Sequence, residues 1–252
     1  MTDTILTRVE DGVLRVQFNR IEKKNAITAE MYEALAEAFA SADERDDVNA
    51  ILLEGTEGVF TSGNDLSAFA NVSAALSEGD EPAVLKWIKA TVLTNTPLVA
   101  AVYGPCIGIG ATILLHFDLV YADETAFWHM PFTELAAVPE ACASWVIRRR
   151  YGSAIAGELL VASEKVSAKR AYDMGLVNKV VDVDVKQHAF EAAKRLATLP
   201  PVAVTETKKL MREDMGPFLA HAEVELREFA ARLQSKEMQE TVMKKMMASK
   251  KG

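Results

Sequence analysis

The sequence predicts an α/β fold that ends in a purely helical section. Short apolar runs with β character alternate with amphipathic helical runs as far as residue 183, and only helical runs follow. Half of the 252 residues are hydrophobic, which is enough for a chain of this length to bury a complete core. One domain with a helical appendage, or two modest domains, is the expected organisation.

Composition excludes several classes of function. A net charge of −8 argues against nonspecific binding to nucleic acid, because neutralising phosphates requires concentrated lysine and arginine. The N-terminus lacks a basic region followed by an apolar one, and no stretch is long and apolar enough to span a bilayer. We therefore expect a cytoplasmic protein with no membrane or nucleic-acid partner; the terminal Ser-Lys-Lys-Gly is not a peroxisomal signal.

The cysteines and histidines give no sign of a metal site. Cys106 and Cys142 are too sparse for a disulfide framework, and no Cys/His cluster has metal-ligand spacing. Each of the four histidines is isolated in the sequence. Only His129, in a polar and aromatic stretch, is retained as a candidate catalytic helper. We expect no metal and no cofactor.

The first half of the chain predicts a hairpin and then alternating elements. A turn at Asp11-Gly12 separates two runs, the second of which alternates apolar and polar residues. Thr28 is a suitable N-cap for the helix that follows. The remaining expectations are a strand over 50–53, a tight turn over 62–65, a surface or flap segment over 70–82, a helix over 84–93 with a core Trp87, and a strand over 98–102.

The second half predicts mainly helices. They are expected over 111–117, 141–150, 153–162, from Ser167 to Gly175, and over 187–199, 202–211, 217–233 and 237–247, with one strand over 177–183.

The stretch from Gly104 to Ser144 carries the clearest chemistry. An apolar strand gives way to a glycine-bearing turn and then to a helical run, a junction that leaves backbone N–H groups free to hold a developing anion. Glu140 follows, between Pro139 and a run of small residues, and could move a proton. A carboxylate in the first turn of a helix is the simpler alternative for Glu140. A dinucleotide fingerprint is disfavoured because Ile113 occupies the place of its third glycine.

Four segments together resemble the crotonase (enoyl-CoA hydratase/isomerase) superfamily. They are FNRIEKKNAIT, FTSGNDLSAF, GPCIGIGATILLHFDLVYADETAFWHMPF and VPEACAS, in that order and spacing. SGNDL and the Pro-Glu followed by small residues are the more specific parts, and their details are most similar to the Δ3,Δ2-enoyl-CoA isomerase branch. The resemblance covers essentially the whole chain.

The resemblance implies a crotonase-like spiral of ββα units around two sheets, with a C-terminal helical section that mediates assembly. The core with the active site would span residues 1–195, and the trimerisation section would span 196–252. It also implies an acyl-CoA thioester as the substrate and a homotrimer or hexamer as the assembly.

Site residues follow from the same resemblance. The backbone N–H groups of Asn64 and Ile109 would form an oxyanion hole for the thioester carbonyl, and Glu140 would be the catalytic acid and base. The other residues expected to bind the substrate are Lys23, Lys24, Asn25, Ala26, Ser62, Gly63, Asp65, Leu66, Gly108 and Phe132. Lys208 and Lys209 are weaker candidates for contact with phosphate.

The chain departs from the hydratase pattern at both carboxylates. Thr112 and Phe132 occupy the two positions where a hydratase of this superfamily carries glutamates. Hydration requires both a base for water and an acid for carbon, so their loss favours isomerisation of 3-enoyl-CoA to trans-2-enoyl-CoA. Glu134 could be a second carboxylate and keeps a hydratase-like reaction open, as does another acyl-CoA reaction on this fold. A non-catalytic acyl-CoA-binding scaffold is the third possibility.

Overall fold

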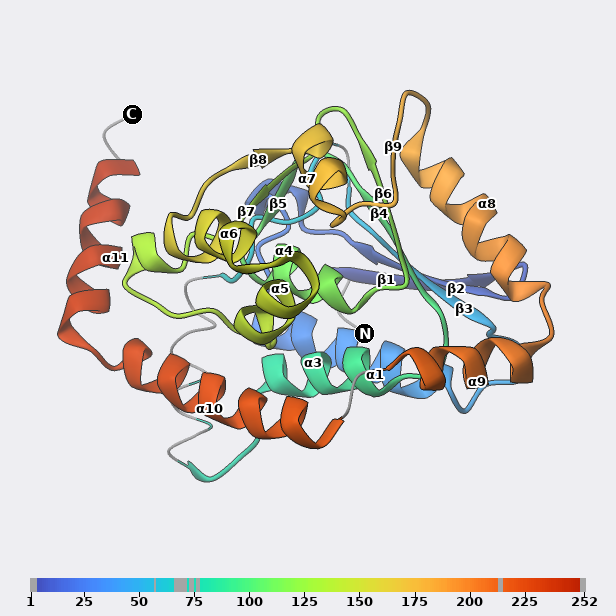
Figure 1. The fold of residues 1–252 in the computed structure, drawn as a ribbon, viewed down its shortest axis with the longest axis horizontal. Coiled ribbons are helices and arrows are strands. Elements are labelled where there is room, and N and C mark those ends of the chain that lie inside the picture. Colours follow the sequence, from blue (N-terminus) through green and yellow to red (C-terminus); the bar gives the residue numbers. More distant parts are fainter. Residues whose placement is uncertain are drawn as a thin grey trace.

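A mostly parallel sheet forms the centre of the molecule. The computed structural model describes residues 4–56, 58–65, 72, 75, 78–212 and 215–249. Its larger sheet has the order β1-β2-β3-β4-β6-β9 (Figure 1). The strands are β1 (Ile5–Glu10), β2 (Val13–Phe18), β3 (Ala50–Glu54), β4 (Leu98–Val102), β6 (Leu119–Asp123) and β9 (Lys179–Val181). Among the described strands of this sheet, β1 and β2 are the only antiparallel neighbours, which confirms the predicted hairpin.

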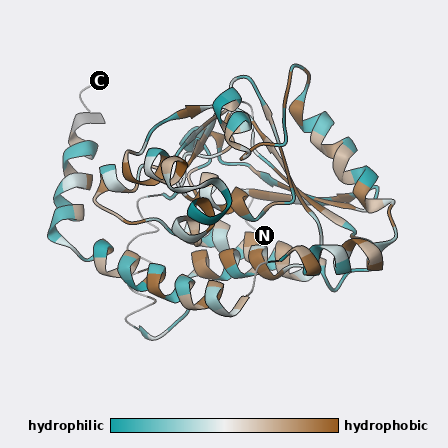
Figure 2. Cartoon of the chain, viewed as in Figure 1, coloured by the Kyte–Doolittle hydropathy of each residue, from teal (hydrophilic) through white to brown (hydrophobic). Residues whose placement is uncertain are grey.

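Side chains on the two faces of this sheet enter two separate cores. In β3, Ile51 and Leu53 belong to the larger core, whereas Ala50 and Leu52 belong to the smaller one. A parallel sheet that is covered on both faces needs apolar residues at consecutive positions rather than at alternate ones. The strands of this sheet are accordingly mostly hydrophobic, whereas the C-terminal helices alternate in hydropathy (Figure 2).

Helices cover both faces of the sheet. On the side of the larger core, α1 (Ala29–Ala42) packs against α3 (Ala83–Leu93), and Trp87 is fully buried there as expected. The Thr28 hydroxyl accepts from Met31 N–H and caps α1. The opposite face is covered by α8 (Val185–Ala197), which contacts β3 and β4. Six of the thirteen residues of the segment 70–82, expected to be a surface or flap segment, lie outside the described residues.

The individual strands of the second, three-stranded sheet were not predicted from the sequence. This sheet contains β5 (Pro105–Ile107), β7 (Phe127–His129) and β8 (Val166–Ser167), with β5 and β7 parallel. Each of β4 and β6 is followed, after a short bend, by a strand of the small sheet. Residues 59–61 repeat this arrangement after β3, because Thr61 forms a parallel bridge with Cys106. Successive units of this kind confirm the expected spiral around two sheets.

Two helices near the predicted site begin at other residues than expected. The run over 111–117 starts earlier, as α4 (Ile109–Thr112), and continues as the 3₁₀ helix η2 (Ile113–His116). The helix expected over 141–150 begins only at Ala143, as α5 (Ala143–Tyr151). The following elements are α6 (Ser153–Ala156), a π-helical turn (Gly157–Val161) and α7 (Ala168–Met174), which ends at Gly175 as predicted.

The C-terminal helices fold back onto the core. They are α9 (Pro201–Met211), α10 (Met215–Leu233) and α11 (Lys236–Ser249). Phe218 and Phe229 of α10 are buried in the larger core, and α10 runs beside α3 (Figure 1). The helical section therefore forms part of the wall around the predicted site. Among the described residues, no helix combines the length and the apolar composition needed to cross a bilayer.

Candidate functional site

Two glycine turns from different spiral units lie against each other. Residues 59–61 run parallel to β5, since Thr61 N–H donates to Pro105 O at 2.9 Å and Ile107 N–H to Thr61 O at 3.1 Å. The carboxyl ends of both segments therefore meet at one edge. Gly63 has a φ of +88°, and a Cβ there would lie 2.9 Å from Ile107 O and 3.7 Å from Gly108 Cα. Glycine is required at this position both by conformation and by the close approach of the neighbouring backbone.

Asn64 and Ile109, the predicted oxyanion-hole residues, each follow one of these touching glycines. Asn64 forms a parallel β-bridge with Ile27. The hydrogen bonds of this bridge come from the residues on either side of Asn64, since Ile27 N–H donates to Gly63 O and Asp65 N–H donates to Ile27 O. Ile109 is the first residue of α4, where backbone N–H groups have no partner within the helix. Within the described residues, neither the Asn64 N–H nor the Ile109 N–H has a hydrogen-bond acceptor. Two unused backbone donors thus lie in neighbouring segments.

Glu140 is buried and is joined to α4. Its Oε1 accepts a hydrogen bond of 2.9 Å from the hydroxyl of Thr112, the last residue of α4. The carboxyl group is therefore connected through one short helix to the Gly108–Ile109 turn. Because α5 begins at Ala143, Glu140 precedes the helix and does not lie in its first turn. The simpler interpretation, a carboxylate placed to stabilise a helix terminus, is therefore wrong.

The environment of Glu140 favours its protonated form. Burial raises the pKa of Glu140 to about 8; the Thr112 hydrogen bond opposes this shift, and the nearby charge of Glu225 adds to it. Burial also holds the pKa of Tyr32 well above its usual value, with a further contribution from Glu140. The Tyr32 hydroxyl donates to Asn64 Oδ1. Tyr32 therefore lies between the predicted oxyanion segment and the predicted acid.

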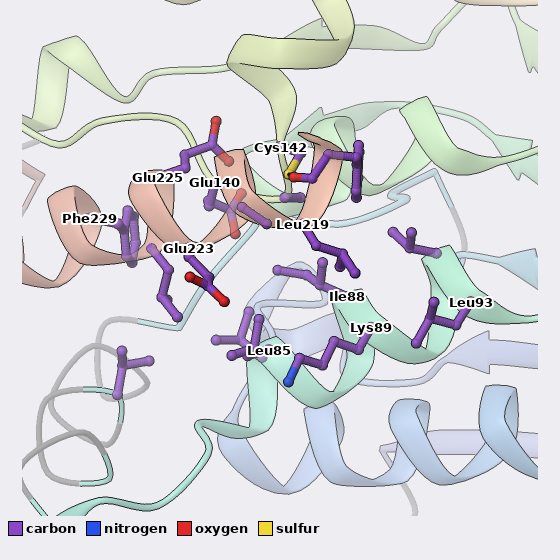
Figure 3. Close-up of a pocket in the computed structure, with 17 residues that line it drawn as sticks. Leu85, Ile88, Lys89, Leu93, Glu140, Cys142, Leu219, Glu223, Glu225 and Phe229 are labelled. Atoms are coloured by element: carbon purple, nitrogen blue, oxygen red, sulfur yellow. The ribbon is translucent and has the colours of Figure 1, made fainter. Parts of the chain in front are cut away.

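An apolar cavity of about 400 Å³ opens beside Glu140 (Figure 3). Its walls come from α3, from α10 and from residues 140–142. Leu85 and Ile88 of α3 face Leu219 and Phe229 of α10 in the close-up, with Glu140 at one end of the group. The cavity can accept an apolar chain whose reacting end lies near the carboxyl group.

The loop over residues 23–26, expected from the resemblance to bind the substrate, lies against the segment Ser62–Asp65. Ser62 N–H donates to Lys24 O at 2.9 Å, and the Thr61 hydroxyl donates to Asn25 O at 2.6 Å. Lys23 and Lys24 are exposed, so their ammonium groups can reach a ligand. Asn25 is fully buried, and its amide donates to Val59 O and Phe60 O at 3.1 and 3.0 Å. The Asn25 side chain therefore holds the loop in place and faces the protein.

The structure brings only some of the remaining predicted substrate-binding residues near one another. Asp65 forms an ion pair of 2.7 Å with Arg20, and the carbonyl oxygen of Ala26 accepts a hydrogen bond from the same guanidinium group. Phe132 is buried and directly precedes the 3₁₀ helix η3 (Thr133–Leu135). Leu66 lies outside the described residues. The Lys208 ammonium group is bound within the protein rather than presented to a phosphate. It donates to Thr96 O at 2.8 Å and to Asp118 Oδ2 at 2.7 Å.

Glu134 and His129 form a separate group at the surface. The Glu134 carboxylate pairs with His129 Nε2 at 3.1 Å and with Lys245 Nζ of α11 at 2.7 Å. These partners lower the pKa of Glu134, with the Lys245 hydrogen bond as the largest cause. Glu134 is therefore an ionised, paired surface carboxylate, unlike Glu140.

Sequence reasoning missed two residues near the predicted acid. Tyr32 lies on α1 and reads as an ordinary core residue, and Glu225 lies on α10, which contributes no residue to the recognised motifs. Glu225 could have been noticed only as an acidic residue on the apolar face shared with Phe218 and Phe229. Among the described residues, no three or more His, Cys, Asp or Glu side chains gather as metal ligands would. Cys106 and Cys142 are both buried, and the two do not form a disulfide with each other.

Comparison with known proteins places this geometry in a family. The chain is 35% identical to enoyl-CoA delta isomerase 2 of Rattus norvegicus over 214 residues, which cover 83% of this chain and 54% of that protein. It is 32% identical to the peroxisomal enoyl-CoA delta isomerase 3 of Mus musculus over 213 residues, or 83% of this chain and 67% of that protein. The chain thus spans about half the length of the first of these relatives.

Solved structures agree with the sequence comparison. An enoyl-CoA hydratase/isomerase from Pseudoalteromonas atlantica T6c superposes with a TM-score of 0.92 at 35% identity, covering 98% of both chains. The family model described as enoyl-CoA hydratase/isomerase matches residues 8–250. The match over nearly the whole chain and the identity with these relatives show that the chain belongs to the enoyl-CoA hydratase/isomerase family.

Proposed function

We propose that the protein converts 3-enoyl-CoA thioesters to trans-2-enoyl-CoA, with Glu140 as the only proton carrier and without a cofactor. The observation that carries the proposal is the buried Glu140 carboxyl group, bound to the same short helix that begins at the Gly108–Ile109 turn. The relatives of this chain include enoyl-CoA delta isomerases. One carboxyl group beside one anion-binding turn suits a reaction in which a proton leaves one carbon and returns to another.

The steps follow from where the groups lie. The thioester oxygen would accept from the N–H groups of Asn64 and Ile109, and the Glu140 carboxylate would remove a proton from C2. The electrons of that C–H bond form a dienolate whose negative charge rests on the thioester oxygen. Glu140 then returns the proton to C4, the double bond lies between C2 and C3, and the carboxylate is regenerated. No atom is gained or lost.

Burial of Glu140 serves this mechanism in two ways. A carboxyl group with a pKa near 8 is a stronger base, once ionised, than an exposed glutamate, and it holds the transferred proton long enough to deliver it. The apolar cavity between α3 and α10 would receive the acyl chain and exclude water from the dienolate.

Hydration of 2-enoyl-CoA is the alternative reaction. It would need a second carboxyl group near the double bond, and the positions of the two hydratase glutamates hold Thr112 and Phe132. Glu134, the remaining candidate, pairs with Lys245 at the surface. These observations favour isomerisation over hydration.

The test is to supply purified protein with 3-enoyl-CoA and to follow 2-enoyl-CoA formation in wild type and in Glu140→Gln. We expect turnover by wild type and loss of about a thousandfold or more in the variant, typical of removal of an essential acid–base group. A substrate deuterated at C2 should yield product with deuterium at C4, because the same carboxyl group carries the proton. Unchanged turnover in Glu140→Gln removes Glu140 from the mechanism.

Two further measurements separate the alternatives. Incubation with crotonyl-CoA and analysis for a 3-hydroxyacyl product detects hydration. Binding of an acyl-CoA without turnover of any enoyl substrate would instead indicate a non-catalytic scaffold.

A further inference from the structure

The turn that carries Glu140 has an unfavourable backbone conformation. Ala141 and Cys142 follow it directly, and both adopt left-handed φ angles, +57° and +56°. Residues with a Cβ rarely adopt this conformation, and two in succession persist only where the surroundings hold them in place. The position of the Glu140 carboxyl group therefore depends on whatever holds residues 141–144.

Helix α10 supplies most of that support, through a buried acid. Glu225 Oε1 accepts from the backbone N–H of Ser144 at 3.1 Å and from the Ser144 hydroxyl at 2.7 Å. The Cys142 N–H also stabilises this carboxylate. His221, one turn earlier on α10, lies with its Nε2 2.8 Å from Ser144 Oγ. Glu225 thus binds the second strained residue, Cys142, and the start of α5 at Ser144.

Two weaker contacts complete the support. Cys142 Sγ lies 3.8 Å from the carbonyl oxygen of Phe218 on α10. From η2, His116 Nε2 lies 2.7 Å from the carbonyl oxygen of Ala141. These contacts do not require a negative charge, whereas Glu225 places a carboxylate in a buried position.

The hydrogen bonds to Ser144 do not by themselves require a charged residue at position 225. Glu225 is 7% exposed, and an uncharged glutamine could also accept from Ser144 at a lower cost of burial. A carboxylate adds negative charge beside Glu140, and the two groups line the same cavity (Figure 3). The charge of Glu225 favours the proton-bearing form of Glu140, the form that delivers the proton to C4 in the proposed reaction.

Other titratable groups lie around Glu225. On α10 itself they are His221, which favours the carboxylate, and Glu223, which lines the same cavity. Lys89 lines the cavity from α3. Arg149 of α5 lies over the Trp145 ring, which in turn contacts the His221 ring. Burial raises the pKa of Glu225, and the donors from Ser144 and Cys142 oppose that shift.

We propose that Glu225 is a positioning residue for Glu140: it fixes the strained turn through Ser144 and, by its charge, strengthens the hold of Glu140 on the transferred proton. This inference rests on the proposed function for its kinetic consequences. It assigns to α10 a part in the reaction that acts through Glu140, in addition to lining the cavity.

The kinetic test compares Glu225→Gln, Glu225→Ala and Glu228→Gln. Glu228 is exposed on the same helix and serves as the matched control. In Glu225→Gln the acidic limb of the pH profile of kcat/KM should move to lower pH by roughly one pH unit, because the repelling charge is gone. In Glu225→Ala the turn loses its anchor, and kcat should fall about 10- to 100-fold with little change in KM. Glu228→Gln should match wild type. A Glu225→Gln profile that superposes on wild type overturns the proposal.

A second test needs no substrate and separates this inference from the proposed reaction. The melting temperatures of wild type, Glu140→Gln, Glu225→Gln and the double variant form a cycle. At pH 8 the effect of Glu140→Gln should be larger when Glu225 is present than when it is replaced. Additive effects would overturn the inference even if the enzyme is an isomerase. Coupled effects in a protein that turns over no 3-enoyl-CoA would support the inference and reject the proposed reaction.

Discussion

The Thr112 hydroxyl lies 2.9 Å from Glu140 Oε1 and connects the predicted acid to the helix that begins at Ile109. By the sequence resemblance, Thr112 stands where a hydratase of this superfamily has a glutamate, and its hydroxyl donates to the acid of the proposed isomerisation. The hydroxyl stabilises the ionised carboxylate against the effect of burial. The Thr112–Glu140 hydrogen bond should therefore influence the pH at which the protein is active.

Replacement of Thr112 by valine should shift the pH dependence of the reaction upwards. Wild-type kcat/KM should rise with pH through about 8, because Glu140 must be ionised to remove a proton. Loss of the hydroxyl donor raises the pKa of Glu140 further, so activity at pH 7 should fall about tenfold and approach wild type above about pH 9. Thr112→Ser keeps the donor and should keep the profile. A uniform loss at every pH would show that Thr112 acts only through packing.

Replacement of Glu140 by glutamine should stabilise the protein at neutral and alkaline pH. An unfolded glutamate ionises near pH 4.5, whereas the folded protein holds the proton to about pH 8. Between these values the native state binds more protons, so wild-type stability falls as pH rises. Glutamine does not titrate, so the variant keeps the free energy of unfolding that wild type loses, on the order of 4 kcal/mol at most. The variant should therefore melt several degrees higher than wild type at pH 8.

The pH dependence distinguishes this effect from a general change in packing. The difference in melting temperature should shrink towards zero as the pH falls to about 4.5 and below, where both states of wild type become protonated. A glutamate that stabilised a helix terminus would behave in the opposite way, and its removal would lower the melting temperature at pH 8. Thermal scans of both proteins across this range measure the difference.

The elements that sequence reasoning located are those with a long local pattern. The β1–β2 hairpin has a turn dipeptide and a clear alternation, and α1 has both a cap and an apolar stripe. By contrast, β5 and β7 are three residues each, too short to show a period. The pairing of β5 with residues 59–61 is nevertheless what brings Gly63 beside Gly108.

The support around Glu140 could not be read from the sequence for a related reason. Glu225 and Ser144 are separated by 81 positions, and only the folded path of α10 brings them together. The resemblance identified Glu140 because the residues next to it in the sequence belong to a recognisable motif. It could not identify Glu225, because the residues next to Glu225 in the sequence are those of an ordinary amphipathic helix.

Replacement of Gly63 by alanine should impair the oxyanion site. The added methyl group would lie 2.9 Å from Ile107 O, and the φ of +88° is unfavourable for alanine. Relief of that contact would separate the Asn64 and Ile109 segments, and loss of one oxyanion donor typically costs about 10²–10³ in kcat. Gly79→Ala is a matched control, because Gly79 has a φ of +81° and a methyl group added there would meet nothing within 4 Å. Equal kcat values for the two variants would contradict the assignment of this edge.

Replacement of Leu219 by tryptophan should shorten the acyl chain that the enzyme accepts. Leu219 lines the cavity from α10, opposite Leu85 and Ile88 of α3 (Figure 3), so an indole ring there would occupy space proposed for the acyl chain. The KM for a long-chain 3-enoyl-CoA should rise about tenfold or more, whereas the kinetic constants for a short-chain substrate should hardly change. Leu210→Trp is the control, since Leu210 is exposed on α9 and does not line the cavity. Kinetics with a series of chain lengths measure the effect, and an equal loss for all lengths would show that the acyl chain lies elsewhere.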